Sequence, residues 1–118
     1  IGYWSGGYGL DDGWPDVSGF VDPSWDEDER IDVGLYLQSG LVARAWMGYS
    51  PCRLCDEQKN GNLDLTDGVY IWPEGLAHYV REHQVRLPRD FVAHVRARAE
   101  LADDVTVDDS WWRHASLD

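Results

Sequence analysis

The sequence is short of positive charge, and this shortage argues against one large class of function. It has 10 Lys and Arg residues against 22 Asp and Glu residues, which gives a formal net charge of −12 at pH 7. Proteins hold the phosphate backbone of nucleic acids mainly through Lys and Arg. We therefore expect no binding to DNA or RNA. A surface this acidic favours solubility or a cationic partner.

Two further shortages concern the cellular compartment. The chain has only two cysteines, too few for the disulfide framework that stabilises many small secreted domains. It also has no apolar run long enough to cross a bilayer and no pattern typical of a signal peptide. These absences predict a cytoplasmic protein that does not use a membrane.

Aromatic residues, in contrast, are plentiful. Seven Trp, six Tyr and two Phe occur in 118 residues, a length that suits one domain. Aromatic side chains bury large areas and can stabilise a small fold. We expect a single domain over residues 1–118, with residues 1–23 forming an irregular arm rich in Gly and aromatic residues. Residues 103–118 are expected to form an acidic tail that Trp111 and Trp112 anchor.

Local patterns predict an α+β fold. A helix is expected over residues 24–40, with Ser24 as its N-cap, acidic residues in its first turn and Gly40 at its end. A strand follows over residues 41–48. Spacing by four predicts that two apolar pairs on this helix face the core: Ile31 with Leu35, and Val33 with Leu37.

The second half of the chain predicts a hairpin and two helices. The apolar runs on either side of Asp67-Gly68 are typical of two strands joined by a tight turn. A helix is expected from Pro73 to His83, and another from Pro88, because proline is common in the first turn. The apolar face expected on the last helix consists of Phe91, Val92, Val95 and Ala99.

The segment SPCRLCD at residues 50–56 contains both cysteines, and two histidines lie further along the chain. Cys52 and Cys55 stand just before the predicted hairpin, and His78 and His83 lie on the predicted helix after it. Two thiolates on a tight turn and two imidazoles on a facing helix are a donor set that zinc binds in a tetrahedron. Histidines five apart point about 140° apart on an ideal helix, so this helix must loosen at its end.

Several alternatives to this ligand set remain open at this point. A redox pair would place its two cysteines at the start of a helix after a strand, whereas a turn-rich hairpin follows here. The two thiols can also be merely structural. Within the zinc interpretation, His94 or His114 can replace His83, and Asp56 can supply an oxygen donor.

The order and spacing of the four residues resemble a Cys2His2 zinc finger of the ββα or treble-clef type. The 22 residues between Cys55 and His78 make a longer gap than in the usual finger. Residues 46–95 also resemble small bacterial proteins without an established activity. The resemblance implies a zinc site at Cys52, Cys55, His78 and His83, in a small domain where a knuckle, a hairpin and a helix are flanked by further helices.

The number of ligands separates two functional hypotheses. Four protein ligands leave no open position, which predicts a structural ion in an acidic binding or regulatory protein that acts through an aromatic-rich surface. Three ligands would allow a small zinc-dependent enzyme. The other alternative is a small-molecule-binding protein with a Trp-lined pocket near Tyr70 and Trp72. The weaker candidates for acid–base catalysis are Asp64, Asp67, Tyr70 and Glu74.

Overall fold

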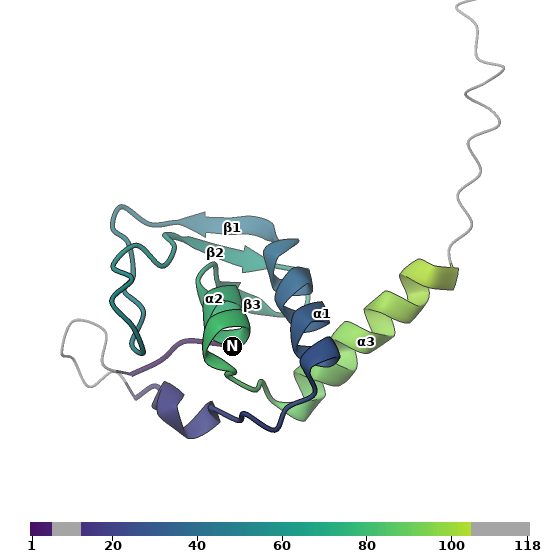
Figure 1. Cartoon of the computed structure of the whole chain (residues 1–118). Coiled ribbons are helices and arrows are strands. Elements are labelled where there is room, and N and C mark those ends of the chain that lie inside the picture. Colours follow the sequence, from purple (N-terminus) through teal and green to yellow (C-terminus); the bar gives the residue numbers. More distant parts are fainter. Residues whose placement is uncertain (6–12, 105–118) are drawn as a thin grey trace, which may run out of the picture.

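The computed structural model describes residues 1–5 and 13–104, and it confirms a small α+β fold (Figure 1). Within these residues a three-stranded antiparallel sheet packs with three α-helices. None of the described helices is long and apolar enough to span a membrane. The elements are the 3₁₀ helix η2 (Val17–Phe20), α1 (Glu27–Gln38), β1 (Leu41–Ala45), β2 (Leu63–Thr66), β3 (Ile71–Pro73), α2 (Leu76–His83) and α3 (Arg89–Asp104).

The sheet has the order β1-β2-β3, so the predicted hairpin is confirmed as β2 and β3. Asp67 begins its turn, because its Oδ1 accepts the backbone N–H groups of Val69 and Tyr70. Gly68 has a φ of +93°, a value that suits glycine. Strand β1 pairs only with β2 among the described residues, and no other element lies beyond it in Figure 1.

Helix α1 begins three residues later than Ser24. Asp26 is the N-cap and accepts the backbone N–H of Glu29, whereas the Ser24 hydroxyl donates to Asp22. The prediction of Ser24 as the cap is therefore wrong. Serine and aspartate are both common N-caps. Here the Asp26 carboxylate accepts the N–H of Glu29, one of the first-turn donors that have no partner within the helix.

The predicted core face of α1 is only half right. Val33 and Leu37 are buried, whereas Ile31 and Leu35 are 43% and 55% exposed. Residues two apart on a helix point about 200° apart, so both pairs cannot face the same core. The sequence pattern alone contained no signal to choose between the two pairs.

Helix α2 also begins later than predicted. Pro73 is the last residue of β3, and the helix starts at Leu76. Proline has no N–H to donate to a strand ladder. It is therefore tolerated at the end of an edge strand such as β3, where that donor is not needed. The helix ends at His83, because Gln84 has the left-handed φ of 55° and Val85 N–H bonds back to the carbonyl of Tyr79. Both histidines lie within α2 and the left-handed residue follows them, so the loosening predicted from the histidine spacing is not seen between His78 and His83.

The core lies between one face of the sheet and the helices. Trp72 of β3 has no exposed surface, and its indole N–H donates to the carbonyl of Leu37 on α1. Its ring also contacts that of Phe91 on α3. Phe91, Val92 and Val95 are buried as predicted, but Ala99 is exposed because the second half of α3 extends away from the sheet (Figure 1).

Candidate metal centre

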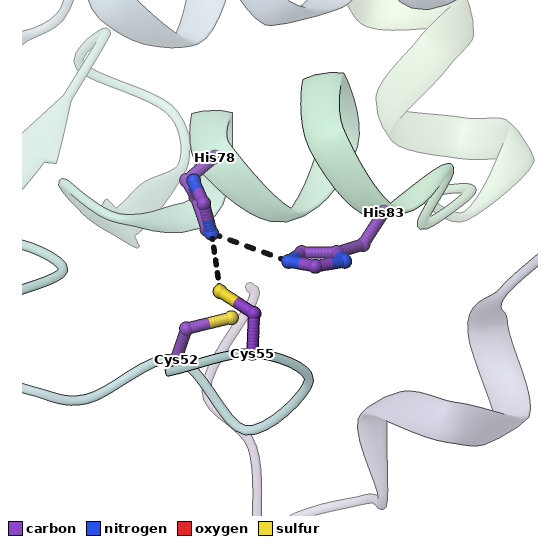
Figure 2. Close-up of side chains that lie close together, drawn as sticks. All are labelled: Cys52, Cys55, His78 and His83. Atoms are coloured by element: carbon purple, nitrogen blue, oxygen red, sulfur yellow. Dashed lines mark hydrogen bonds between the residues drawn. The ribbon is translucent and has the colours of Figure 1, made fainter. Parts of the chain in front are cut away.

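The structure brings Cys52, Cys55, His78 and His83 together (Figure 2). The cysteines lie on the loop between β1 and β2, and the histidines lie on the first and last turns of α2. One ligand atom from each residue lies within 4.8 Å of the other three. Figure 2 shows all four side chains pointing toward one region between the loop and the helix. This cluster can hold a metal ion.

Two distances within the cluster match the edges of a tetrahedral zinc site. Zinc–sulfur bonds of about 2.3 Å and zinc–nitrogen bonds of about 2.0–2.1 Å give tetrahedral edges of about 3.6 Å for S···N and about 3.3 Å for N···N. The Cys55 Sγ to His78 Nε2 distance is 3.4 Å, and the His78 Nε2 to His83 Nε2 distance is 3.2 Å. Both agree with the expected edges within 0.2 Å, the tolerance expected of a metal site.

Hydrogen bonding alone accounts poorly for these contacts. His78 Nε2 approaches both Cys55 Sγ and His83 Nε2. A ring nitrogen either donates its one proton or accepts with its one lone pair, so it makes one well-directed bond rather than two. A cation among the three atoms would explain both approaches, because each atom would direct its lone pair to the ion.

Contacts outside the cluster hold the cysteine loop in place. The backbone N–H of Leu54 donates to Cys52 Sγ at 3.4 Å, a bond that stabilises a thiolate. The backbone N–H of Arg53 donates to the hydroxyl of Tyr79, which is buried on α2 between the two histidines. Tyr79 therefore fixes the loop against the helix at the position where the ligands meet. No pattern in the sequence indicates this role for Tyr79.

Burial shifts the pKa values of one cysteine and one histidine of the cluster, and only the histidine shift favours the form that binds metal. Burial raises the pKa of the Cys52 thiol. Burial, together with the charge of His78, lowers the pKa of His83 and favours its neutral ring. A neutral imidazole is the form that binds metal, and a coordinated thiol loses its proton because the ion's charge outweighs the cost of burial.

The alternative ligands are placed elsewhere or outside the described residues. His94 lies away from the cluster, and its Nε2 atom is 2.6 Å from Oδ2 of Asp67 in the hairpin turn. Asp56 does not belong to the cluster found among the described residues, and His114 lies outside them. The two cysteines are not joined by a disulfide, and a loop rather than a helix follows them.

Asp67 and Tyr70 belong to a second cluster, at the turn of the hairpin. Asp67 Oδ2 accepts the hydroxyl of Tyr36 at 2.5 Å and lies 2.6 Å from His94 Nε2. The Tyr70 ring packs edge-on against the His94 ring at 4.9 Å. The cluster joins α1, the hairpin and α3. Tyr36 was not singled out from the sequence, because it lies 31 residues from Asp67 and no local pattern links them.

The charged form of Asp67 is stabilised in the folded protein. Burial raises its pKa, but hydrogen bonds from Tyr36, from the backbone of Tyr70 and Val69, and from His94 outweigh burial and hold the pKa well below its usual range. Burial and the same carboxylate raise the pKa of Tyr36 to about 12, so the phenol stays protonated and donates.

We expect Asp67→Asn to lower the free energy of unfolding by about 1–3 kcal/mol at pH 7, since the amide cannot accept all four bonds. A carboxyl with a lowered folded pKa stabilises the fold above its unfolded pKa of about 3.9, and this contribution is lost as the pH falls through the folded value. The difference from the wild type should therefore stay constant above about pH 5 and narrow below about pH 4. Urea titrations at several pH values measure the difference in the free energy of unfolding between the variant and the wild type. The control is Asp32→Asn, on the exposed face of α1. Equal stabilities at pH 7 would contradict the prediction.

Asp64 and Glu74 lie in separate surroundings from Asp67. Asp64 is 2% exposed, and its carboxylate accepts from Tyr3, Trp46 and Arg44. Glu74 Oε1 accepts the backbone N–H of Asn62. The four carboxylate and phenol candidates thus do not form one site, and a catalytic role for any of them stays a prediction.

A cavity of about 530 Å³ lies at the end of the sheet where β2 starts. Tyr3, Trp46, Asp64 and Glu74 are among its lining residues, together with the loop at residues 60–62. Trp72 is fully buried in the core and does not line this cavity, so a Trp-lined pocket near Tyr70 and Trp72 stays a prediction. A tryptophan does line the cavity, but it is Trp46, which follows β1.

Comparisons of the chain with protein-family models, with curated proteins and with solved structures gave no match. The metal centre is therefore assigned from its own residues and their geometry.

Proposed function

We propose that Cys52, Cys55, His78 and His83 bind a zinc ion that stabilises the fold of an acidic binding or regulatory protein. The observation that supports this most is the approach of four ligand atoms, from two segments of the chain, to within 4.8 Å of one another. Two sulfurs and two imidazole nitrogens are a donor set typical of zinc, which binds them in a tetrahedron.

The ion in this proposal is structural rather than catalytic. Four protein ligands complete a tetrahedral sphere and leave no position for water or substrate. The ion would join the loop between β1 and β2 to α2, a connection that the hydrogen bond from Arg53 to Tyr79 reinforces. Its binding free energy would then be part of the free energy of folding.

The binding role is supported by exposed apolar residues on β1 and on the loop that follows it. We call this set the contact strip: Leu41, Val42, Trp46, Met47 and Tyr49. Leu41 is 74% exposed although it lies on a strand of the sheet, and Met47, in the loop after that strand, is fully exposed. Exposed apolar patches and uncovered edge strands are typical of protein contacts, in which Trp, Tyr and Met are enriched. We propose a protein partner and no nucleic acid.

The zinc assignment is tested by metal content and by cobalt exchange. We expect one zinc ion per chain after purification, measured by elemental analysis and by mass spectrometry under native conditions. Replacement with Co²⁺ should give the intense visible absorption of a tetrahedral site and a sulfur-to-metal charge-transfer band. A weak octahedral spectrum, or no bound metal in the purified chain, would contradict the proposal.

The contact strip is tested by photo-crosslinking followed by reconstitution. A photoreactive residue at Met47 is expected to give a discrete product with a second protein in cells. The same residue at Val69, which is 64% exposed on the hairpin turn, is the control and should give none. The captured protein must then bind the purified wild type, with Met47→Glu binding at least about tenfold more weakly. Equal binding by both would place the contact elsewhere.

A further inference from the structure

The cavity at the end of the sheet has an unusual combination of linings. Its walls include the aromatic rings of Tyr3 and Trp46 and the apolar side chains of Met47, Leu63 and Pro73. Its charged linings are the carboxylates of Asp64 and Glu74, and no Lys or Arg is among the lining residues. A volume of about 530 Å³ is within the range of small-molecule sites, which combine apolar walls with a few polar groups.

The two aromatic rings are held in place by the carboxylate beneath them. The Tyr3 hydroxyl donates to Asp64 Oδ1 at 3.1 Å, and the Trp46 indole N–H donates to Asp64 Oδ2 at 3.0 Å. Each ring therefore has its polar end fixed, and the Tyr3 ring is held further by its contact with the Trp14 ring. Such preorganised walls reduce the entropy that a ligand loses on binding.

The charges around the cavity are unequally compensated. Arg44 Nε lies 3.2 Å from Asp64 Oδ2, so this carboxylate already has a cationic partner. Among the described residues, no ion pair involves Glu74, and the one hydrogen bond of its carboxylate is accepted by Oε1 from the backbone N–H of Asn62. Glu74 therefore brings an uncompensated negative charge to the cavity wall.

The aromatic surface already attracts one cation. The guanidinium of Arg44 lies 5.2 Å from the centre of the Trp46 ring. Cations lie over aromatic faces because the ring carries negative charge there, and the attraction increases when water is excluded. A cation that enters the cavity would thus have both a ring face and the free carboxylate oxygen of Glu74 as partners.

We propose that this cavity binds the ammonium group of an organic cation with a short apolar chain, either as a free alkylamine or as a lysine side chain of a partner. The apolar chain packs against Leu63, Pro73 and Met47, and the ammonium group lies between Trp46 and Glu74. The site is independent of the metal centre, since none of its lining residues is a metal ligand.

The two sources are distinguished with four probes added to the zinc-loaded protein. Butylammonium is compared with neutral butanol, and the capped tripeptide Gly-Lys-Gly with its Nε-acetylated form. Binding is followed by the amide and indole N–H signals in ¹H–¹⁵N NMR spectra, with the Trp46 indole signal identified by its absence in Trp46→Phe. We expect both cations to shift this signal with a Kd on the order of 1 mM, and the neutral probes to bind at least about tenfold more weakly.

Variants separate this site from the general attraction of an acidic protein for cations. Glu74→Gln keeps the acceptor for Asn62 N–H and should weaken cation binding about tenfold. Asp32→Asn removes one negative charge from the exposed face of α1 and should change the Kd for the cation by less than about twofold. Arg44→Gln should strengthen cation binding, because it removes the guanidinium that competes with the ligand for the Trp46 ring. The metal content of every variant is measured in parallel.

The outcomes decide between the possibilities. Tighter binding of the lysine peptide than of butylammonium supports a protein partner as the source, and tighter binding of butylammonium supports a free amine. Equal binding of the charged and neutral probes, or equal effects of Glu74→Gln and Asp32→Asn, would overturn the proposal. So would the absence of any shift at concentrations about tenfold above the expected Kd.

Discussion

Replacing Cys52 with serine is expected to abolish zinc binding and, with it, the cooperative thermal unfolding transition. The thiolate is one of four ligands, and serine is a poor substitute because its hydroxyl stays protonated at neutral pH. The binding free energy of a structural zinc, about 10–16 kcal/mol, is comparable with the entire stability of a typical domain, about 5–15 kcal/mol. Circular dichroism during heating and elemental analysis of the same sample measure both losses. Treatment of the wild type with a strong chelator should have the same effect.

Two histidine variants provide a matched control for this experiment. His83→Gln removes a proposed ligand, whereas His94→Gln changes a histidine that contacts Asp67 and lies outside the cluster. We expect the first to lose the metal and the second to keep it. If the Cys52→Ser protein kept its fold and lost only the metal, the ion would not be structural. If it retained the metal, the ligand set itself would be wrong.

The cluster of two cysteines and two histidines was predictable because its pattern is local and its chemistry is restrictive. Cys52 and Cys55 are three residues apart, His78 and His83 are five apart, and few functions need two thiols and two imidazoles in that order. The spacing of the histidines even required that the helix end near His83. The helix ends at His83 and the left-handed Gln84 follows it, but the two histidines themselves stay within the helix, and their side chains converge without the predicted loosening between them.

The two carboxylate clusters could not be predicted in the same way. Tyr3 reaches Asp64 across 61 residues and His94 reaches Asp67 across 27 residues. Neither separation corresponds to a helical or a strand period, so no pattern in the sequence indicates the contact. The helix pattern likewise allowed Ile31 and Leu35 to be placed in the core. Only tertiary packing decides which stripe of a moderately apolar helix is buried.

Replacing Asp64 with alanine is expected to destabilise the protein by about 2–3 kcal/mol, which lowers the melting temperature by about 10 °C. The carboxylate is 2% exposed and is the acceptor for the Tyr3 hydroxyl and the Trp46 indole N–H. Its removal leaves both donors without an acceptor and Arg44 without its ion pair. Burial, with the charge of Asp64 and its hydrogen bond, raises the pKa of Tyr3 to about 12, so this phenol remains a donor throughout the neutral range.

The corresponding control is Arg44→Gln, which removes the cation of the same cluster. Arg44 has 57% of its side chain exposed, so its ion pair with Asp64 is screened by water and should contribute less than about 1 kcal/mol. The two variants therefore separate the hydrogen-bond acceptor from the ion pair. If they destabilised the protein equally, the role of Asp64 would be that of a counter-ion. A larger loss for Asp64→Ala with unchanged zinc content would show that this carboxylate joins the strand β2 to Trp46 and Tyr3 independently of the metal.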